Sequence, residues 1–219
     1  MSRHELQFAV RHAQTDVDLR AACAVRATAY GRHLPNVTSL WSEPDALDRS
    51  PDSAVFVAFC KRTGEAVGTI RLTTNAYQPT QIEQSTALPH GIGERSIAEL
   101  TRFAVRAGHA DPGVKLGLMK AAYLYCLAHQ VHWMVIGARN AALARQYKRL
   151  GFTDLAGGAM VPLAHAADLP HRVLAFDVVS AERNWFAVRH PLYEFMVRHY
   201  HPDIRPFAAG AGAVAAAAA

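Results

Sequence analysis

Residues Ser96–Val105 read SIAELTRFAV, and this stretch decides how the chain folds. It is apolar enough for a buried strand, yet it carries a carboxylate, Glu99, and a guanidinium, Arg102. Side chains alternate between the faces of a regular strand, which would place Glu99 with Phe103 and Arg102 with Ala104. A β-bulge would change this arrangement, and bulges beside active sites re-aim side chains into clefts.

The segment after this strand predicts a helix that is buried against a sheet. A Gly-containing turn at 111–113 leads into residues 114–129, which are apolar nearly all round. A strand, a loop and a helix N-terminus in this order suit the binding of an anion. Residues 133–138 then predict a strand, and residues 140–150 predict an amphipathic helix that ends at Gly151.

The rest of the chain predicts further strands and helices around this unit. Upstream we expect a strand at 7–11, a helix from Thr15 or Asp16 to Tyr30 with Gly31 as its stop, and a hairpin of strands 54–60 and 66–74. The segment 32–52 is expected to be a long irregular loop or helical turn, and the segment 75–95 is expected to be irregular. Downstream we expect strands at 158–165 and 173–179 around a turn with Pro170, and a last helix at 181–200 that bends or restarts at Pro191.

This order of elements predicts an α/β or α+β fold, a sheet flanked by helices. The chain has 219 residues, of which 51% are hydrophobic and 19% charged, as in one globular domain of ordinary size. We expect that domain to span residues 1–207. The Gly/Ala-rich tail 208–219 has no packing pattern and is expected to be disordered.

Several classes of function are disfavoured by composition. No apolar run reaches the ~18 residues of a membrane span, and no apolar segment follows the N-terminus as in a signal peptide, so we expect a cytoplasmic protein. The three cysteines are scattered, which argues against disulfides and a thiolate zinc site. The histidine pairs 129/132 and 199/201 lack further ligands at metal spacing, so no metal is expected.

The net charge of +5 favours an acidic partner. The basic residues do not run together, which makes nucleic-acid binding a weak interpretation. A phosphorylated cofactor or an acidic carrier protein suits the charge better.

The element order, with Asn140, Tyr147 and Gly151-Phe152 at their spacing, resembles the GNAT superfamily of acyltransferases. A sharper resemblance is to the acyl-homoserine lactone synthases and their relatives, the N-acyl amino acid synthases, over roughly residues 25–152. The positions that carry it are Arg26 and Tyr30, Asp45 and Asp48, Gly68 to Arg71-Leu72, and Glu99 to Val105. The resemblance implies a mixed, mostly antiparallel sheet with a splayed, V-shaped cleft.

The same resemblance implies that an acyl thioester, on acyl carrier protein or coenzyme A, passes its acyl chain to the amine of an amino acid, with no permanently bound cofactor. The pantetheine arm would lie along Phe103, Ala104 and Val105. Its phosphates would meet the helix start around Gly113, Lys115 and Gly117, and Asn140 joins this set of cofactor-binding residues. The usual phosphate loop is altered here, with Val114 and Met119 at its outer positions, which favours a carrier protein recognised by Lys115, Lys120 and Arg106.

The residues themselves supply the chemistry of acyl transfer. Glu99 is a reasonable general base for the amine, and strand amides near Phe103 and Ala104 are donors for the oxyanion. The resemblance makes Tyr147 the acid for the leaving thiolate, and Arg102 is expected to be catalytic with Glu99 and Tyr147. Arg26, Arg71 and Arg102 lie in apolar settings and suit a substrate carboxylate. With Tyr30, Asp45 and Asp48 they form the expected acceptor site.

Alternatives remain open at this point. Glu99 and Arg102 would also fit a plain salt bridge, Arg26 with Asp45 and Asp48 would fit a brace for a loop, Tyr147 would fit helix packing, and Arg71 would fit an edge position. At the level of function, the alternatives are an acetyl-coenzyme A-dependent N-acetyltransferase, an acyl-homoserine lactone synthase, and a non-catalytic binder of lipid or carrier protein.

Overall fold

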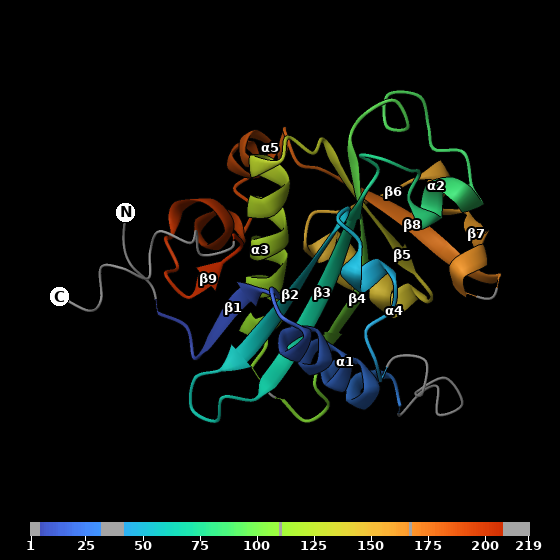
Figure 1. The fold of residues 1–219 in the computed structure, drawn as a ribbon. Helices are drawn as coiled ribbons and strands as arrows, with labels where there is room; N and C mark the ends of the chain where they lie inside the picture. Colours follow the sequence, from blue (N-terminus) through green and yellow to red (C-terminus); the bar gives the residue numbers. More distant parts are fainter. Residues whose placement is uncertain (1–4, 32–41, 110, 167, 208–219) are drawn as a thin grey trace.

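The computed structural model describes residues 5–31, 42–109, 111–166 and 168–207. Its sheet has nine strands in the order β6-β8-β5-β4-β3-β2-β1-β9, with β7 also paired to β8, and Figure 1 shows them fanning out from β1 to β8. The strands are β1 (Phe8–His12), β2 (Ser53–Cys60), β3 (Ala66–Thr74), β4 (Ile97–Val105), β5 (Trp133–Ala138), β6 (Thr153–Asp154), β7 (Met160–Leu163), β8 (Leu169–Asp177) and β9 (Ile204–Arg205). The β4–β5 and β1–β9 pairs are parallel, and the other pairs are antiparallel.

Helices flank this sheet. They are α1 (Asp16–Tyr30), α2 (Gln81–Ser85), α3 (Gly113–Ala128), α4 (Ala141–Arg149) and α5 (Ala181–Ala187), with short 3-10 turns η2 (Leu47–Arg49), η3 (Ala156–Gly158) and η4 (Ala164–Ala166) and a π-helical turn η5 (Glu194–Arg198). Within the described residues there is no helix whose length and apolar character would let it cross a membrane.

The two faces of the sheet have different contents. Along β2, Phe56 and its alternate neighbours pack into the main core with α3, whereas Val55 and Val57 pack with Ala22 of α1. The main core also includes Tyr123 of α3, Tyr147 of α4 and Trp185 of α5. The α1 side holds a smaller apolar cluster around Ile82 of α2. Most of the buried apolar side chains therefore lie on the α3 side of the sheet, and the α1 side also accommodates buried polar groups.

The strands β4 and β5 pair over only part of their length. Their register runs from Ile97 opposite Trp133 to Leu100 opposite Ile136. Both strands continue beyond this point, β4 to Val105 and β5 to Ala138. The sheet thus splays between its two central strands, as the resemblance implied.

A β-bulge lies at the end of the paired part of β4. Arg71 of β3 is opposite Thr101, but Thr69 is opposite Ala104, so Ile70 faces both Arg102 and Phe103. Arg102 adopts a φ of +54°, in the left-handed region that non-glycine residues seldom occupy. The bulge corrects the simple alternation: Arg102 turns to the α1 side, towards Asp45, and Phe103 packs with the core on the α3 side.

Most predicted elements are confirmed, because their periodicity and end signals are local. The first helix spans Asp16–Tyr30, with Thr15 capping the amide of Asp18. The strands at 66–74 and 133–138 are found with the expected bounds. Gly151, which was expected to end the amphipathic helix, follows it with a φ of +99° that favours glycine.

Three predictions of local structure are wrong. The segment 75–95 contains helix α2, and Pro170 lies within β8, paired with Pro162, rather than in the turn. The expected helix at 181–200 ends at Ala187, well before Pro191, and the chain resumes as the separate turn η5. Residues 32–41 of the predicted loop and the tail 208–219 lie outside the described residues.

Candidate active site

Five charged side chains on the α1 side form a connected group, which we call the arginine cluster: Arg26, Asp45, Asp48, Arg71 and Arg102. At its centre the guanidinium of Arg26 donates two hydrogen bonds to the carboxylate of Asp48, at 2.6 and 2.9 Å. These two side chains are only 2% and 1% exposed. A bidentate pair of this kind is strong and directional, and it fixes the loop that carries Asp48 against helix α1.

Arg71 joins this pair to the sheet. Its Nη1 donates to Asp45 at 2.7 Å and to Asp48 at 3.2 Å, and its Nε donates to the Thr101 hydroxyl at 3.0 Å. Sequence reasoning missed Thr101 because a threonine in a strand carries no signal of function. The edge position considered for Arg71 is wrong, since β3 lies inside the sheet between β2 and β4.

Arg102 completes the cluster at its more accessible end. Its Nη2 lies 3.5 Å from Asp45, the side chain is 26% exposed, and that of Asp45 is 34% exposed. Three guanidiniums share two carboxylates, so the cluster carries an excess positive charge. Burial and the nearby Arg71 lower the pKa of Arg102. An anionic group, such as a substrate carboxylate, would relieve this excess charge.

The carboxylate of Glu99 occupies a second position on the same face, which we call the Glu99 site. It is 2% exposed, and its Oε2 accepts a hydrogen bond from the backbone amide of Ile82 at 3.0 Å. This amide belongs to the first turn of α2, whose N-cap is Thr80. Burial raises the pKa of Glu99 to about 7, although the α2 amides and Arg71 act in the opposite direction. A carboxyl group with this pKa can exchange a proton at neutral pH.

The surroundings of Glu99 were not foreseen from the sequence. Thr80 and Glu83 form a capping box, and this Thr-x-x-Glu pattern is the signal that would have revealed α2. His165 of η4 places its Nε2 3.8 Å from Oε1 of Glu99, and no sequence pattern marked it. Glu99 and Arg102, which were candidates for a salt bridge to each other, lie beside different groups in the described residues: Arg102 beside the carboxylate of Asp45, and Glu99 beside the imidazole of His165.

Tyr147 lies on the opposite face of the sheet, in the main core. Its ring stacks on that of Phe103 at a centroid distance of 6.4 Å and an interplanar angle of 11°. Burial, with a smaller contribution from Tyr30, raises the pKa of Tyr147 above its ordinary value. Tyr30, the last residue of α1, is half-buried, and burial raises its pKa too, while Arg102 and Arg26 lower it. Tyr30 thus lies within electrostatic range of both the arginine cluster and Tyr147.

The start of α3 is arranged differently from a simple phosphate cradle. The amide of Gly113 donates to Asp111 Oδ1 at 2.8 Å. Gly117 is buried, and a Cβ there would meet the ring of Phe8 at 2.6 Å, so this glycine lets the helix approach β1. Lys115 is half-buried, and burial lowers its pKa.

The expectation that Lys120 recognises a carrier protein is wrong. Lys120 is 4% exposed and donates to the carbonyls of Phe195 and His199 at 2.7 and 2.6 Å, so it holds the C-terminal segment. Arg106 remains partly exposed, beside Glu65.

The remaining predicted contacts with the acyl donor gather around the splay of the sheet. Phe103 and Val105 pack against the main core, and Ala104 is 5% exposed. Asn140 is the N-cap of α4, and its Oδ1 accepts from the amide of Leu143 at 2.9 Å. The C-terminal end of β4, along which the thioester arm is expected to lie, therefore contacts α4 through the stacked rings of Phe103 and Tyr147.

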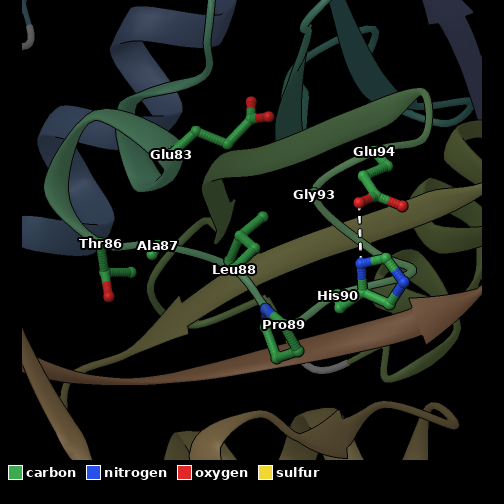
Figure 2. A pocket seen from close by; sticks show the side chains of 8 residues that line it. All are labelled: Glu83, Thr86, Ala87, Leu88, Pro89, His90, Gly93 and Glu94. Atoms are coloured by element: carbon green, nitrogen blue, oxygen red, sulfur yellow. Dashed lines mark ion pairs between the residues drawn. The ribbon is translucent and has the colours of Figure 1, made fainter.

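A surface cavity of about 440 Å³ lies between α2 and the loop that follows it. Figure 2 shows its lining and the ion pair of 2.7 Å between His90 and Glu94. The lining consists of Glu83, Thr86, Ala87, Leu88, Pro89, His90, Gly93 and Glu94, so the predicted site residues lie elsewhere. Among the described residues, no three histidine, cysteine or acidic side chains come together to hold a metal ion.

The family model for the N-acyl amino acid synthase FeeM matches residues 21–171. The chain belongs to the FeeM family of N-acyl amino acid synthases. Membership makes it an enzyme, an N-acyltransferase of the type that includes FeeM and the acyl-homoserine lactone synthases. The predicted family and activity are thereby confirmed at this level. No curated protein sequence matches the chain.

Solved structures show the shared fold. FeeM from uncultured soil microbes is 21% identical, with a TM-score of 0.63 over 86% of this chain and 98% of FeeM. The coenzyme A-dependent acyl-homoserine lactone synthase BjaI is 18% identical, with a TM-score of 0.57 over 89% of this chain and 93% of BjaI. An acyl-CoA N-acyltransferase from Pseudomonas aeruginosa is 19% identical, with a TM-score of 0.51 over 77% and 97% of the two chains. The GNAT-like fold class is thus confirmed.

Proposed function

We propose that this member of the FeeM family moves a medium or long acyl chain from acyl carrier protein, or from acyl-coenzyme A, to the amine of an amino acid. The observation that carries the proposal is the pairing of two unlike sites on one face of β4. A buried carboxylate with a pKa of about 7 lies beside an arginine cluster with excess positive charge. An amino acid offers the two matching groups, an amine and a carboxylate.

The acceptor would bind at the accessible end of the arginine cluster. Arg102 and Asp45 are partly exposed, whereas Arg26, Asp48 and Arg71 are buried. The substrate carboxylate pairs with Arg102, and the buried members hold Arg102 in place. Tyr30 lines the same end, within electrostatic range of Arg102. The amine then points to Glu99, which lies on the same strand, β4, on the N-terminal side of Arg102.

The substrate ammonium first loses one proton to solvent. As the neutral amine attacks, Glu99, as general base, accepts a second proton from the nitrogen. The nitrogen bonds to the thioester carbonyl carbon, and the resulting oxyanion is stabilised by amides of β4 near Phe103 and Ala104, beyond the part of β4 that pairs with β5. The carbon–sulfur bond then breaks, and the products are an N-acyl amino acid and a thiolate, which takes a proton from water to become the free thiol.

Tyr147 acts on the leaving group by hydrogen bonding. The raised pKa keeps its hydroxyl protonated at neutral pH, so it donates a hydrogen bond to the departing thiolate without giving up its proton. Arg102 is catalytic in the sense that it fixes the acceptor beside Glu99. The donor arm lies along Phe103, Ala104 and Val105, with Gly113, Lys115, Gly117 and Asn140 at its outer end.

A carrier protein is the preferred donor. At the start of α3, Asp111 occupies the amide of Gly113, which weakens this helix end as a site for the several phosphates of coenzyme A. A phosphopantetheine arm carries a single phosphate, for which the half-buried Lys115 and the partly exposed Arg106 suffice. The basic net charge of the chain suits the acidic surface of a carrier protein.

The test combines purified protein, a long-chain acyl carrier protein and a mixture of amino acids. We expect thiol release and an N-acyl amino acid in the mass spectrum, and we expect neither with Glu99→Gln. Parallel reactions with long-chain acyl-coenzyme A, acetyl-coenzyme A and S-adenosylmethionine separate the other donors and a lactone product. Release from acetyl-coenzyme A alone would overturn the proposal in favour of an acetyltransferase.

A further inference from the structure

The Glu99 site poses a problem of proton release. A general base must return its proton to solvent before the next turnover, and the carboxylate of Glu99 is 2% exposed. Its Oε2 is occupied by the Ile82 amide at 3.0 Å. The proton taken from the acceptor therefore needs an exit through Oε1.

His165 is the group that faces this oxygen. Its Nε2 lies 3.8 Å from Oε1 of Glu99, and its side chain is 22% exposed, so it connects the buried carboxylate to the surface. The distance exceeds a hydrogen bond, and catalytic contacts in structures without substrate are often long and tighten when substrate binds. His165 comes from η4, next to the turn that precedes β8.

The other groups around Glu99 are unsuited to carry the proton. Arg71 of β3 is permanently charged, and the α2 amides of Gln81 and Ile82 only donate. Glu83 of α2 is engaged in the capping box, where it accepts from Thr80 at 2.7 Å and from Asn75 at 3.1 Å. Of the groups that the described residues place around Glu99, the imidazole of His165 alone both accepts a proton and reaches solvent.

This inference rests on the proposed role of Glu99 as general base. We propose that His165 is the proton exit of the active site and acts as a positioning residue that serves Glu99. After the amine has lost its proton to Glu99, the Oε1–H bond breaks and the proton adds to Nε2 of His165. The imidazolium then passes a proton to water, which restores the carboxylate and the neutral imidazole.

The electrostatics around His165 favour rapid release. Burial, with smaller contributions from His171 of β8, Arg102 of β4 and Arg71 of β3, lowers its pKa to about 4. The imidazolium is therefore short-lived and does not hold the proton. The positive charges of Arg71 and Arg102 repel the proton on the imidazolium, so water at the exposed side of His165 is its acceptor.

The experiment compares wild type, His165→Gln and His165→Asn in the acyl-transfer assay, with the imidazole concentration varied at constant pH and ionic strength. We expect kcat to fall by on the order of 10²-fold in both variants with KM unchanged, and to recover as imidazole is added. The matched control is His90→Gln, since His90 is 90% exposed and contacts Glu94 instead of Glu99. It should behave as wild type.

Two results would overturn the inference: wild-type kcat in either His165 variant that folds, or a loss of kcat that imidazole leaves unchanged. A urea midpoint within error of wild type shows that a variant folds, and the second substitution serves if the first does not. Failure of the proposed function is distinguishable, because Glu99→Gln would then match wild type or wild type would show no transfer.

Discussion

The arginine cluster and the Glu99 site each contain a deeply buried carboxylate on the same face of the sheet, yet their partners differ. The side chain of Asp48 is 1% exposed and meets two guanidiniums, from Arg26 and Arg71. Glu99 is 2% exposed and meets a helix amide and an imidazole. Burial alone therefore does not mark a catalytic acid. The partner decides whether a buried carboxylate serves as a fixed anion or as a group that titrates near neutral pH.

The comparison also separates stability from function. Arginine partners are permanently charged, so they pair with the carboxylate of Asp48 and hold the loop that carries it. An amide and a neutral imidazole compensate the charge of Glu99 less completely, which leaves its ionised form strained and reactive.

The largest effect is expected on activity at the Glu99 site. Glu99→Gln keeps an oxygen that can accept from Ile82 but removes the base, so the rate of acyl transfer should fall about 10²- to 10⁴-fold. In wild type, kcat/KM should rise with pH through about 7, because Glu99 acts in its ionised form. Initial rates of thiol release from pH 5.5 to 8.5 measure both. A flat profile through this range would contradict the assignment.

In the arginine cluster the largest effect is expected on stability. Asp48→Ala leaves Arg26 buried without its carboxylate and should lower the free energy of unfolding by about 3–5 kcal/mol. The matched control is Asp45→Ala. The side chain of Asp45 is 34% exposed, so this substitution should lower the free energy of unfolding by about 1 kcal/mol or less. Urea unfolding at pH 7 followed by circular dichroism compares the two. Equal losses would show that burial does not distinguish these aspartates.

The same Glu99→Gln variant should be more stable than wild type at alkaline pH. The pKa of Glu99 is about 7 in the folded chain against an ordinary 4.5, so the ionised form opposes folding by about 3 kcal/mol above pH 7. This destabilisation is absent below pH 4.5 and grows as pH rises from there to 7. Urea unfolding should show that Glu99→Gln has a higher free energy of unfolding than wild type at pH 8 but not at pH 4.5. A gain that does not depend on pH would point to packing rather than charge.

The smallest effect concerns the backbone at the bulge. Arg102 has a φ of +54°, so Arg102→Gly should relieve about 1 kcal/mol of strain and also remove a charge repelled by Arg71. Gln130→Gly is the control, since Gln130 is exposed and has the same φ of +54°. Each variant should raise the urea midpoint, and the difference between the two increases measures the effect of removing the charge of Arg102. Acceptor KM should rise only in Arg102→Gly, and an unchanged KM would remove Arg102 from the acceptor site.

The prediction from sequence succeeded for most elements, and the fold brings the candidate residues of the charged face together, although their roles stay predictions. Glu99, Arg26, Arg71 and Arg102 were marked by a charge in an otherwise apolar segment. Asp45 and Asp48 were marked by the family resemblance. It failed at α2, where the capping box of Thr80 and Glu83 was overlooked, and at Lys120, whose charge looked available on an isolated helix. Single-strand alternation also misplaced Arg102 and Phe103, because the bulge depends on pairing with β3.

The amino-acid sequence alone indicated most of the strands and helices and the presence of ionisable groups within apolar segments, because these features depend on periodicity and end signals within a few residues. Only the tertiary structure decided which buried carboxylate would be neutralised by arginine and which would stay titratable. The partners that settle this are distant in the chain: 22 residues separate Arg26 from Asp48, and 17 separate Ile82 from Glu99. The pKa of a buried group depends on the atoms packed around it, and those atoms are brought together only by the fold.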